Sequence, residues 1–386
     1  MRPPVPAESD FTSRLRSPAV TARVGLWLGI SFGIAFLTGL VSHWAKLPHP
    51  WIAFPTRPTW GYRVTQGLHV ISGTAAVPLL LVKLWTVYPK LLARPPRRLR
   101  QLALHGAERL SIAVLVTAAI FQLATGIANT AEWYPWHFTF VRTHYALGWI
   151  AIGALLLHVA VKLPVIRSAL GADLESSALD RPTAAATSGV LSRRGLLRTT
   201  WAAAGVAVLA TAGSTVPWLR QVSVLAVRSG DGPQGVPVRT SAETARVTAA
   251  ATSAAYRLTV VHDGREHVFT RADLEAMPQT SAELPIACVE GWSAGATWRG
   301  VRMRDLLDHV GAPLGRDVGV ASLQQRGSFR NTRLPDRYAD DATTLLALEL
   351  NGETLSIDHG YPCRVIAPDR PGELQTKWVT RLKVLS

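Results

Sequence analysis

The chain has 386 residues, a formal net charge of +15, and 48% hydrophobic but only 17% charged residues. This composition is too apolar for an ordinary soluble protein, and the length is sufficient for two domains. The basic residues flank apolar stretches and do not line one folded face, so we predict no nucleic-acid partner.

Five stretches within the first 220 residues lack Asp, Glu, Lys and Arg and approach the roughly 20 residues that cross a bilayer. They cover residues 24–44, 64–82, 110–131, 145–161 and 199–219. Soluble helices normally carry a polar stripe, so transmembrane helices are favoured over the buried helices of a soluble bundle. We predict a four-helix membrane domain at residues 1–169, a linker at 170–200 and a fifth, anchoring helix at 201–219.

The basic residues predict the orientation of these helices. Lys and Arg concentrate in the N-terminal arm and in the segments 90–109 and 167–198, whereas the loops 43–62 and 132–140 are rich in Trp, Tyr and Pro. Cytoplasmic loops carry the excess of basic residues. We therefore expect a multi-pass cell-membrane protein with a cytoplasmic N-terminus and, after five spans, an extracytoplasmic C-terminal domain.

Three histidines qualify as functional candidates in the predicted spans: His69 in the second, His144 at the start of the fourth and His158 further along the fourth. Ionisable side chains in spans are costly and mark function by default. His144 and His158 are 14 residues apart, about 21 Å along a helix, which places them at opposite leaflets. The second and fourth spans both run from outside to inside, so equal depth pairs His69 with His144. The alternative is that these side chains bridge helices without a metal.

This arrangement resembles the four-helix b-type cytochromes, in which imidazoles from facing helices bind haem iron from both sides. The resemblance implies one haem b at His69 and His144, with electron exchange with the membrane quinone pool. His158 is a candidate ligand for a second haem, for which His105 could serve as partner if the third helix begins near residue 102.

The run Ser-Arg-Arg-Gly-Leu-Leu-Arg at residues 192–198 precedes an apolar segment rich in Ala and Gly. It resembles a twin-arginine export signal, which implies the twin-arginine export machinery as a partner and a folded, cofactor-loaded cargo. We expect the segment to remain as an uncleaved anchor. An ordinary basic flank of a span is the alternative.

A second linker is predicted at residues 220–234, and residues 235–386 form the last domain. Short alternating apolar runs near 256–261 and 267–269 predict strands, and Thr270 to Asp273 gives a helix start signal. Short helices between strands indicate a mixed α+β domain.

Cys288 ends one of these strands and carries the most informative motif of the chain. A thiolate on rigid backbone, with glycines nearby, suits a metal that keeps open positions. A Glu-Gly-Trp-Ser turn follows at residues 290–293, and further motif residues follow in order: Trp298, Gly300, Leu306, Leu307, Asn351, Gly352, His359, Gly360, Pro362, Arg364, Lys377 and Trp378. This order resembles the molybdopterin-binding domain of the sulfite oxidase family.

The resemblance implies that Cys288 is the catalytic cysteine and binds molybdenum. It also implies that His359, Arg364, Lys377 and Trp378 line the pyrophosphate of molybdopterin, for which Arg offers a planar fork of donors and Lys a point charge. We expect two-electron oxygen-atom transfer on a small-molecule substrate such as sulfite or a sulfoxide. The alternative is a membrane electron-transfer cytochrome with a non-catalytic external binding domain.

Two features depart from the family pattern. Members usually carry a pocket tyrosine near residues 327–331, where this chain has Phe329. The chain also ends soon after the strand predicted at 379–385, so we expect a catalytic module without the further dimerisation domain of sulfite oxidases. Cys363 is predicted to be a small core residue; a disulfide with Cys288 is the alternative, but it would consume the metal ligand.

Overall fold

The computed structural model describes residues 8–93, 95–180, 191–226 and 232–385. It divides into two compact units: unit 1 comprises Met1–Leu37 and Leu68–Thr211, and unit 2 comprises Thr38–Gly67 and Ala212–Ser386. Residues 38–67, which the sequence places in the membrane domain, therefore group with the C-terminal domain.

Among the described residues, five helices are long and apolar enough to cross a membrane, as the sequence predicts. They are α1 (Pro18–Ala45), α2 (Gly61–Val87), α3 (Leu99–Thr130), α4 (Phe140–Gly171) and α5 (Arg193–Thr211). Short 3-10 helices accompany them at η1 (Glu8–Asp10), η2 (Arg14–Arg16) and η3 (Tyr88–Leu92). The ends of α1 and α2 that adjoin their connecting loop belong to unit 2.

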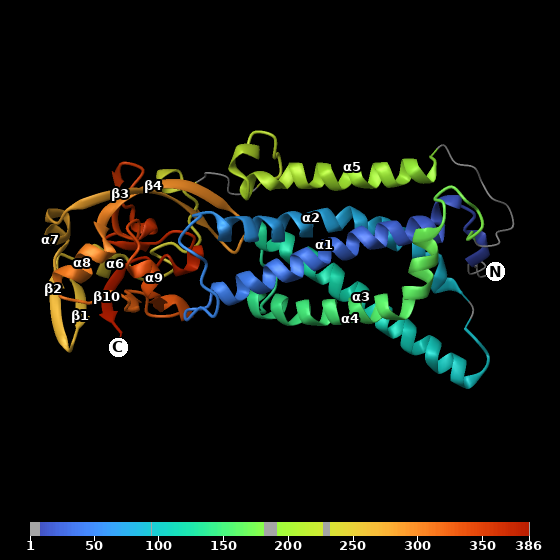
Figure 1. The fold of residues 1–386 in the computed structure, drawn as a ribbon, viewed down its shortest axis with the longest axis horizontal. Helices are drawn as coiled ribbons and strands as arrows, with labels where there is room; N and C mark the ends of the chain where they lie inside the picture. Colours follow the sequence, from blue (N-terminus) through green and yellow to red (C-terminus); the bar gives the residue numbers. More distant parts are fainter. Residues whose placement is uncertain (1–7, 94, 181–190, 227–231, 386) are drawn as a thin grey trace. The chain divides into compact units, whose positions relative to one another are not determined.

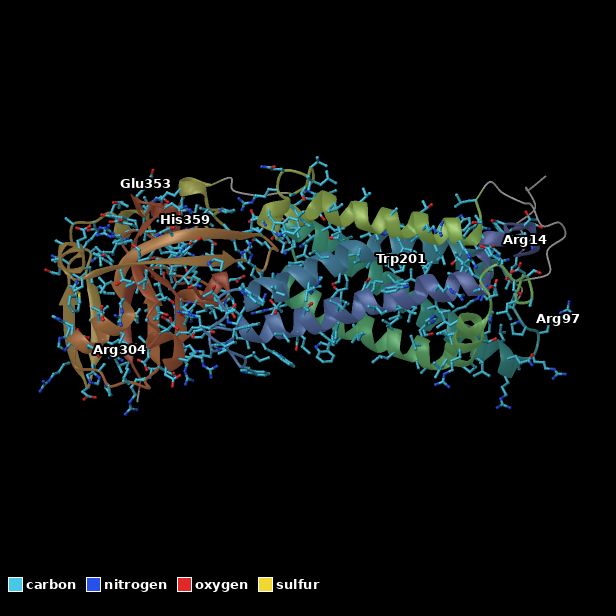
Figure 2. The ribbon with its side chains drawn as sticks, turned by 45° about the horizontal axis from the view of Figure 1, so that its top comes forward. Arg14, Arg97, Trp201, Arg304, Glu353 and His359 are labelled. Atoms are coloured by element: carbon cyan, nitrogen blue, oxygen red, sulfur yellow. The ribbon has the colours of Figure 1, made fainter. Side chains whose placement is uncertain are left out.

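Within unit 1 the helices lie side by side (Figure 1). Val20 and Val24 of α1 pack with Leu79 of α2 in a small buried cluster. The rings of Trp27 on α1 and Trp201 on α5, the latter labelled in Figure 2, have their centres 4.3 Å apart. Aromatic and aliphatic contacts therefore join α1 to both α2 and α5.

The fifth helix does not occupy the predicted range. α5 begins at Arg193 because the Ser192 side chain accepts a hydrogen bond (3.0 Å) from the amide of Gly195. The chain then leaves the α-helix near Gly213 and Pro217, and forms the short 3-10 helices η4 (Ala212–Ser214) and η5 (Pro217–Leu219). Residues 181–190 and 227–231 of the two predicted linkers lie outside the described residues.

Unit 2 contains two five-stranded sheets (Figure 1). The first has the order β2-β1-β10-β5-β6, and the second has β3-β4-β7-β8 with β9 also paired to β7. The strands are β1 (Leu258–His262), β2 (Arg265–Phe269), β3 (Gln279–Ala287), β4 (Ser293–Arg302), β5 (Val318–Ser322), β6 (Asn331–Leu334), β7 (Leu345–Leu350), β8 (Glu353–Thr354), β9 (Arg364–Ile366) and β10 (Val379–Val384).

Short helices connect these strands, which confirms the predicted mixture of helices and strands. They are η6 (Pro233–Gly235), α6 (Thr248–Ala251), α7 (Arg271–Ala276), α8 (Met303–His309), η7 (Ser328–Arg330), α9 (Asp336–Ala339), η8 (Ile357–His359) and η9 (Gly372–Leu374). α7 begins at the predicted signal, where Thr270 and Asp273 form a reciprocal capping box.

The segment between α1 and α2 is held on the C-terminal part of unit 2 by hydrogen bonds. The amide of Arg333 donates to the carbonyl of Pro48 (2.9 Å), and the hydroxyl of Tyr338 donates to the carbonyl of Phe54 (2.8 Å). The amide of Tyr62, in the first turn of α2, donates to the carboxylate of Asp369 (2.6 Å). A connection between two predicted spans thus forms part of the sheet domain.

Candidate functional site

Cys288 is the first residue of the tight turn that joins β3 to β4. Its amide donates to the carbonyl of Trp292 (2.9 Å), and its carbonyl accepts from the amide of Gly291 (3.1 Å). Gly291 has a φ of 92°, which an L side chain rarely adopts. Cys288 is buried, and burial raises the pKa of its thiol well above the usual range, with Glu373 and Glu290 acting in the same direction.

An arginine compensates the carboxylates beside this turn. Arg239 pairs with Glu290 (2.9 Å) and with Glu373 (2.8 Å), and both carboxylate side chains are almost fully buried. The indole of Trp292 donates a further hydrogen bond to Glu290 (3.2 Å). Arg239 therefore bridges both carboxylates near Cys288, and no group of metal-binding residues is found among the described residues.

The predicted basic residues come together from three separate segments. His359, labelled in Figure 2, ends η8, and its Nε2 lies 2.8 Å from the carbonyl of Pro233. Arg364 opens β9 and donates to the carbonyls of Gln375 (3.2 Å) and His359 (3.3 Å). Lys377, two residues before β10, donates to the carbonyls of Thr240 (2.6 Å) and Asp358 (2.8 Å).

Gly360 allows these segments to approach one another. It has a φ of 115°, and a Cβ atom there would lie 3.1 Å from the Cβ of Lys377 and 3.2 Å from that of Arg364. Trp378 packs beneath the group: it is fully buried, and its indole donates to the carbonyl of Ile357 (2.7 Å). The motif residues therefore form one compact cluster.

The cluster carries positive charge without a carboxylate partner. Among the described residues, Arg364 and Lys377 form no ion pair and donate to carbonyls. Burial lowers the pKa of Arg364 to about 9, that of Lys377 to about 7 and that of His359 to about 4. Cys288 interacts electrostatically with both Arg364 and Lys377, so its thiol lies within range of the cluster. A buried anion beside Cys288 would compensate this charge, which fits a pyrophosphate group.

The second cysteine has a different environment. Cys363 is buried in the main hydrophobic core of unit 2, and its Sγ lies 3.1 Å from the hydroxyl of Tyr256. That hydroxyl also donates to the carbonyl of Val379 (2.5 Å). The predicted core position of Cys363 is confirmed, and both thiols are free.

Sequence reasoning missed the contribution of residues 38–67 to the surroundings of Cys288. The side-chain amide of Gln66 donates to the carbonyl of Val289 (2.9 Å), and Lys46 and Tyr62 lie within electrostatic range of Cys288. No local motif marks these residues, because more than 220 positions of sequence separate Gln66 from the turn that it contacts. Phe329 lies in η7 and offers no hydroxyl.

His69 and His144 come together in unit 1. Their ring centres are 6.2 Å apart and the rings are inclined by 73°. The Nδ1 of His69 lies 2.7 Å from the carbonyl of Ala35, which favours a proton on Nδ1 and an unprotonated Nε2. Two imidazoles that bind one iron at about 2 Å from opposite sides have ring centres about 6 Å apart. The pair therefore fits bis-histidine ligation.

His158 has other neighbours. The charged groups that act on it include Lys83, Lys162 and Glu108. α3 begins at Leu99, so His105 is helical, as its predicted role as a partner requires. Glu108 forms an ion pair with Lys162. The part of the chain that the structure describes thus shows an ionic group around His158 and no ring contact between His158 and His105.

The fold and the site together define a class: a chain with five apolar helices among its described residues and a mixed α+β domain that holds a buried cysteine near two buried basic side chains. Residues 244–386 match the family model described as the oxidoreductase molybdopterin binding domain. The predicted molybdopterin-binding oxidoreductase domain of the sulfite oxidase type is therefore confirmed for the C-terminal part of the chain.

Individual relatives match over similar or shorter stretches. The chain is 30% identical to the mitochondrial sulfite oxidase of Drosophila melanogaster over 157 residues, which cover 33% of this chain and 27% of that protein. It is 32% identical over 119 residues to an Azospira oryzae protein named as a candidate protein-methionine-sulfoxide reductase subunit, YedZ1, covering 31% of this chain and 44% of that protein. The solved sulfane dehydrogenase SoxCD of Paracoccus pantotrophus matches with 27% identity and a TM-score of 0.30, over 33% of this chain and 38% of that one. The chain thus spans well under two thirds of these relatives.

Proposed function

We propose that the chain is a membrane-bound molybdenum oxidoreductase that carries its own b-type cytochrome. The observation that carries the proposal is the convergence of Cys288 with Arg364 and Lys377, which are buried and form no ion pair among the described residues. Bound molybdopterin would supply two-electron oxygen-atom transfer, and bound haem b would supply one-electron exchange with the quinone pool. The substrate class is a small sulfur oxyanion or a sulfoxide.

The residues of the chain have distinct roles in this proposal. Cys288 holds the metal on a turn that its own backbone hydrogen bonds keep rigid. Arg364 and Lys377 bind the pyrophosphate, and His359 is held near them by the carbonyl of Pro233. Burial keeps His359 neutral at pH 7, since its pKa falls to about 4.

His69 and His144 are proposed as the axial ligands of the haem, supported by the 6.2 Å between their ring centres. The hydrogen bond from His69 to Ala35 orients its imidazole. His158 is retained as a candidate ligand of a second haem.

The proposed topology places the catalytic domain outside the cytoplasm, after an odd number of spans. The loop between α1 and α2 contacts the C-terminal sheets, for example through Pro48 and Arg333, which supports a common side for both. At the opposite ends of the helices, the side chain of Arg193 donates to the carbonyls of Arg14 (3.0 Å), Leu174 (3.1 Å) and Ser176 (2.5 Å). These contacts support a common side for two of the three basic segments, the N-terminal arm and residues 167–198, which positive charge assigns to the cytoplasm.

We further propose export through the twin-arginine machinery.

Metal and haem analysis of the purified full-length protein tests the proposal. We expect one molybdenum and one haem b per chain, with a low-spin bis-imidazole spectrum. Haem without molybdenum, in a host that makes molybdopterin, would favour the electron-transfer cytochrome with a non-catalytic domain. Sulfite as electron donor and methionine sulfoxide as electron acceptor then distinguish the two substrate classes.

A further inference from the structure

The turn that carries Cys288 is supported from outside the two sheets. Three alternating carbonyls of the turn each accept a hydrogen bond from a side chain elsewhere in unit 2. Gln66 donates to Val289 (2.9 Å), Thr215 to Gly291 (2.5 Å) and Arg220 to Ser293 (3.3 Å). The donors come from the first turns of α2 and from the segment that follows α5.

Gln66 has the most constrained position of the three donors. Its Oε1 accepts from the hydroxyl of Ser42 (2.9 Å), and that hydroxyl lies 3.1 Å from the hydroxyl of Tyr62. The residues Ser42, Tyr62 and Gln66 are only 5%, 1% and 4% exposed. Because Ser42 occupies the oxygen of the amide, its nitrogen must face Val289.

We propose that Gln66 is a positioning residue for the molybdenum ligand, an inference that rests on the proposed function of Cys288. The carbonyl of Cys288 accepts a hydrogen bond from the amide of Gly291, and the carbonyl of Val289 accepts one from the side chain of Gln66. These two hydrogen bonds fix the orientation of the two peptide groups that follow the cysteine. Removing the amide leaves the half-buried carbonyl of Val289 without this donor and frees the backbone to rotate. The orientation of Sγ at the metal then changes. The helix α2, which carries His69, therefore also supports the catalytic cysteine.

Two substitutions test this role in the full-length protein with both cofactors. Gln66→Met keeps the length of the side chain but removes the amide, and Gln66→Glu keeps the acceptor for Ser42 while removing the donor to Val289. The matched control is Thr65→Val, because among the described residues the hydroxyl of Thr65 donates to the carbonyl of Gly61 within its own helix (3.0 Å) and to no atom of the Cys288 turn. Stepwise reduction with dithionite is followed by the electron paramagnetic resonance signal of Mo(V) and by haem absorbance.

We expect both Gln66 variants to retain wild-type molybdenum and haem contents, to show shifted g-values of the Mo(V) signal, and to turn over about tenfold more slowly. Thr65→Val should match the wild type in all respects. Unchanged g-values in the Gln66 variants would overturn the inference even if turnover fell, since a structural role alone could slow the enzyme.

Thr215→Val provides a second measurement should the Gln66 variants fail to fold. It removes the donor to Gly291 from a different segment and should also shift the Mo(V) signal. Unchanged g-values in this variant would then overturn the inference. A wild-type protein without a Mo(V) signal would refute the proposed function itself, and the inference with it.

Discussion

The cationic cluster and the outer supports of the Cys288 turn belong to the same unit but leave different traces in the sequence. His359, Arg364 and Lys377 occur within 19 positions, in a fixed order with Gly360 between them, and can be recognised before folding. Gln66, Thr215 and Arg220 are isolated polar residues in or beside apolar segments. The chemistry of a cofactor restricts which residue types can bind it and in which order they occur. A residue that supports a turn needs only a polar side chain long enough to reach a backbone carbonyl, so it forms no recognisable motif.

The sharpest way to test the role of the membrane region is to remove its histidines. His69→Ala and His144→Ala should each abolish the same low-spin haem, because both imidazoles would bind one iron. Reversed-phase separation and haem quantification per chain provide the measurement. His49→Ala, in the loop between α1 and α2, is the control and should keep the full haem content.

His158→Ala extends this test. A haem content equal to that of the wild type would establish a single haem, and a content reduced by half would establish a second one. Normal haem in His69→Ala would contradict the assignment of the axial pair.

The next prediction concerns export. Arg193 is buried, and its hydrogen bonds and its ion pair with Asp180 make it structural, whereas Arg194 is exposed. Arg194→Lys keeps the charge and the fold but alters the proposed export motif. We expect the catalytic domain to be retained in the cytoplasm, protected from protease added to intact spheroplasts. Digestion equal to that of the wild type would show that positive charge alone is sufficient.

The burial of Lys377 predicts a pH dependence of the cofactor-free protein. Its pKa falls to about 7 in the folded state, below the usual value of about 10.4, so the unfolded chain binds more protons between these limits. Stability should therefore rise between pH 7 and 9, by at most about 3 kcal/mol. Denaturant unfolding of protein from a host without molybdopterin measures this. Lys377→Met should lose this part of the pH dependence, and equal slopes in both proteins would contradict the assignment.

Much of the architecture could be predicted from the sequence because its signals are local. The apolar stretches indicated five helices, and the Thr270–Asp273 signal marked the start of α7. The predicted bounds of the fifth helix were wrong at both ends. The Ser192 side chain caps the helix so that it begins at Arg193, and an apolar composition does not show that the helix ends before Gly213 and Pro217. The grouping of residues 38–67 with the C-terminal sheets could not be predicted, since it depends on long-range hydrogen bonds such as that from Tyr62 to Asp369.

The smallest effect is expected at the second cysteine. Cys363→Ala removes a thiol beside Tyr256 in the core and should lower the free energy of unfolding by about 1–2 kcal/mol. Turnover should remain close to that of the wild type. Denaturant unfolding and activity assays on the same preparation check both points. An inactive variant of normal stability would indicate that the roles of the two cysteines are reversed.

X-ray absorption at the molybdenum edge tests the central claim most directly, by comparing the wild type with Cys288→Ser. In the wild type, sulfur neighbours of molybdenum should include the thiolate of Cys288. The variant should lose one sulfur neighbour and all measurable turnover while the haem spectrum stays unchanged, because the histidine pair belongs to unit 1. An unchanged sulfur count with undiminished turnover in Cys288→Ser would contradict the assignment of the molybdenum ligand.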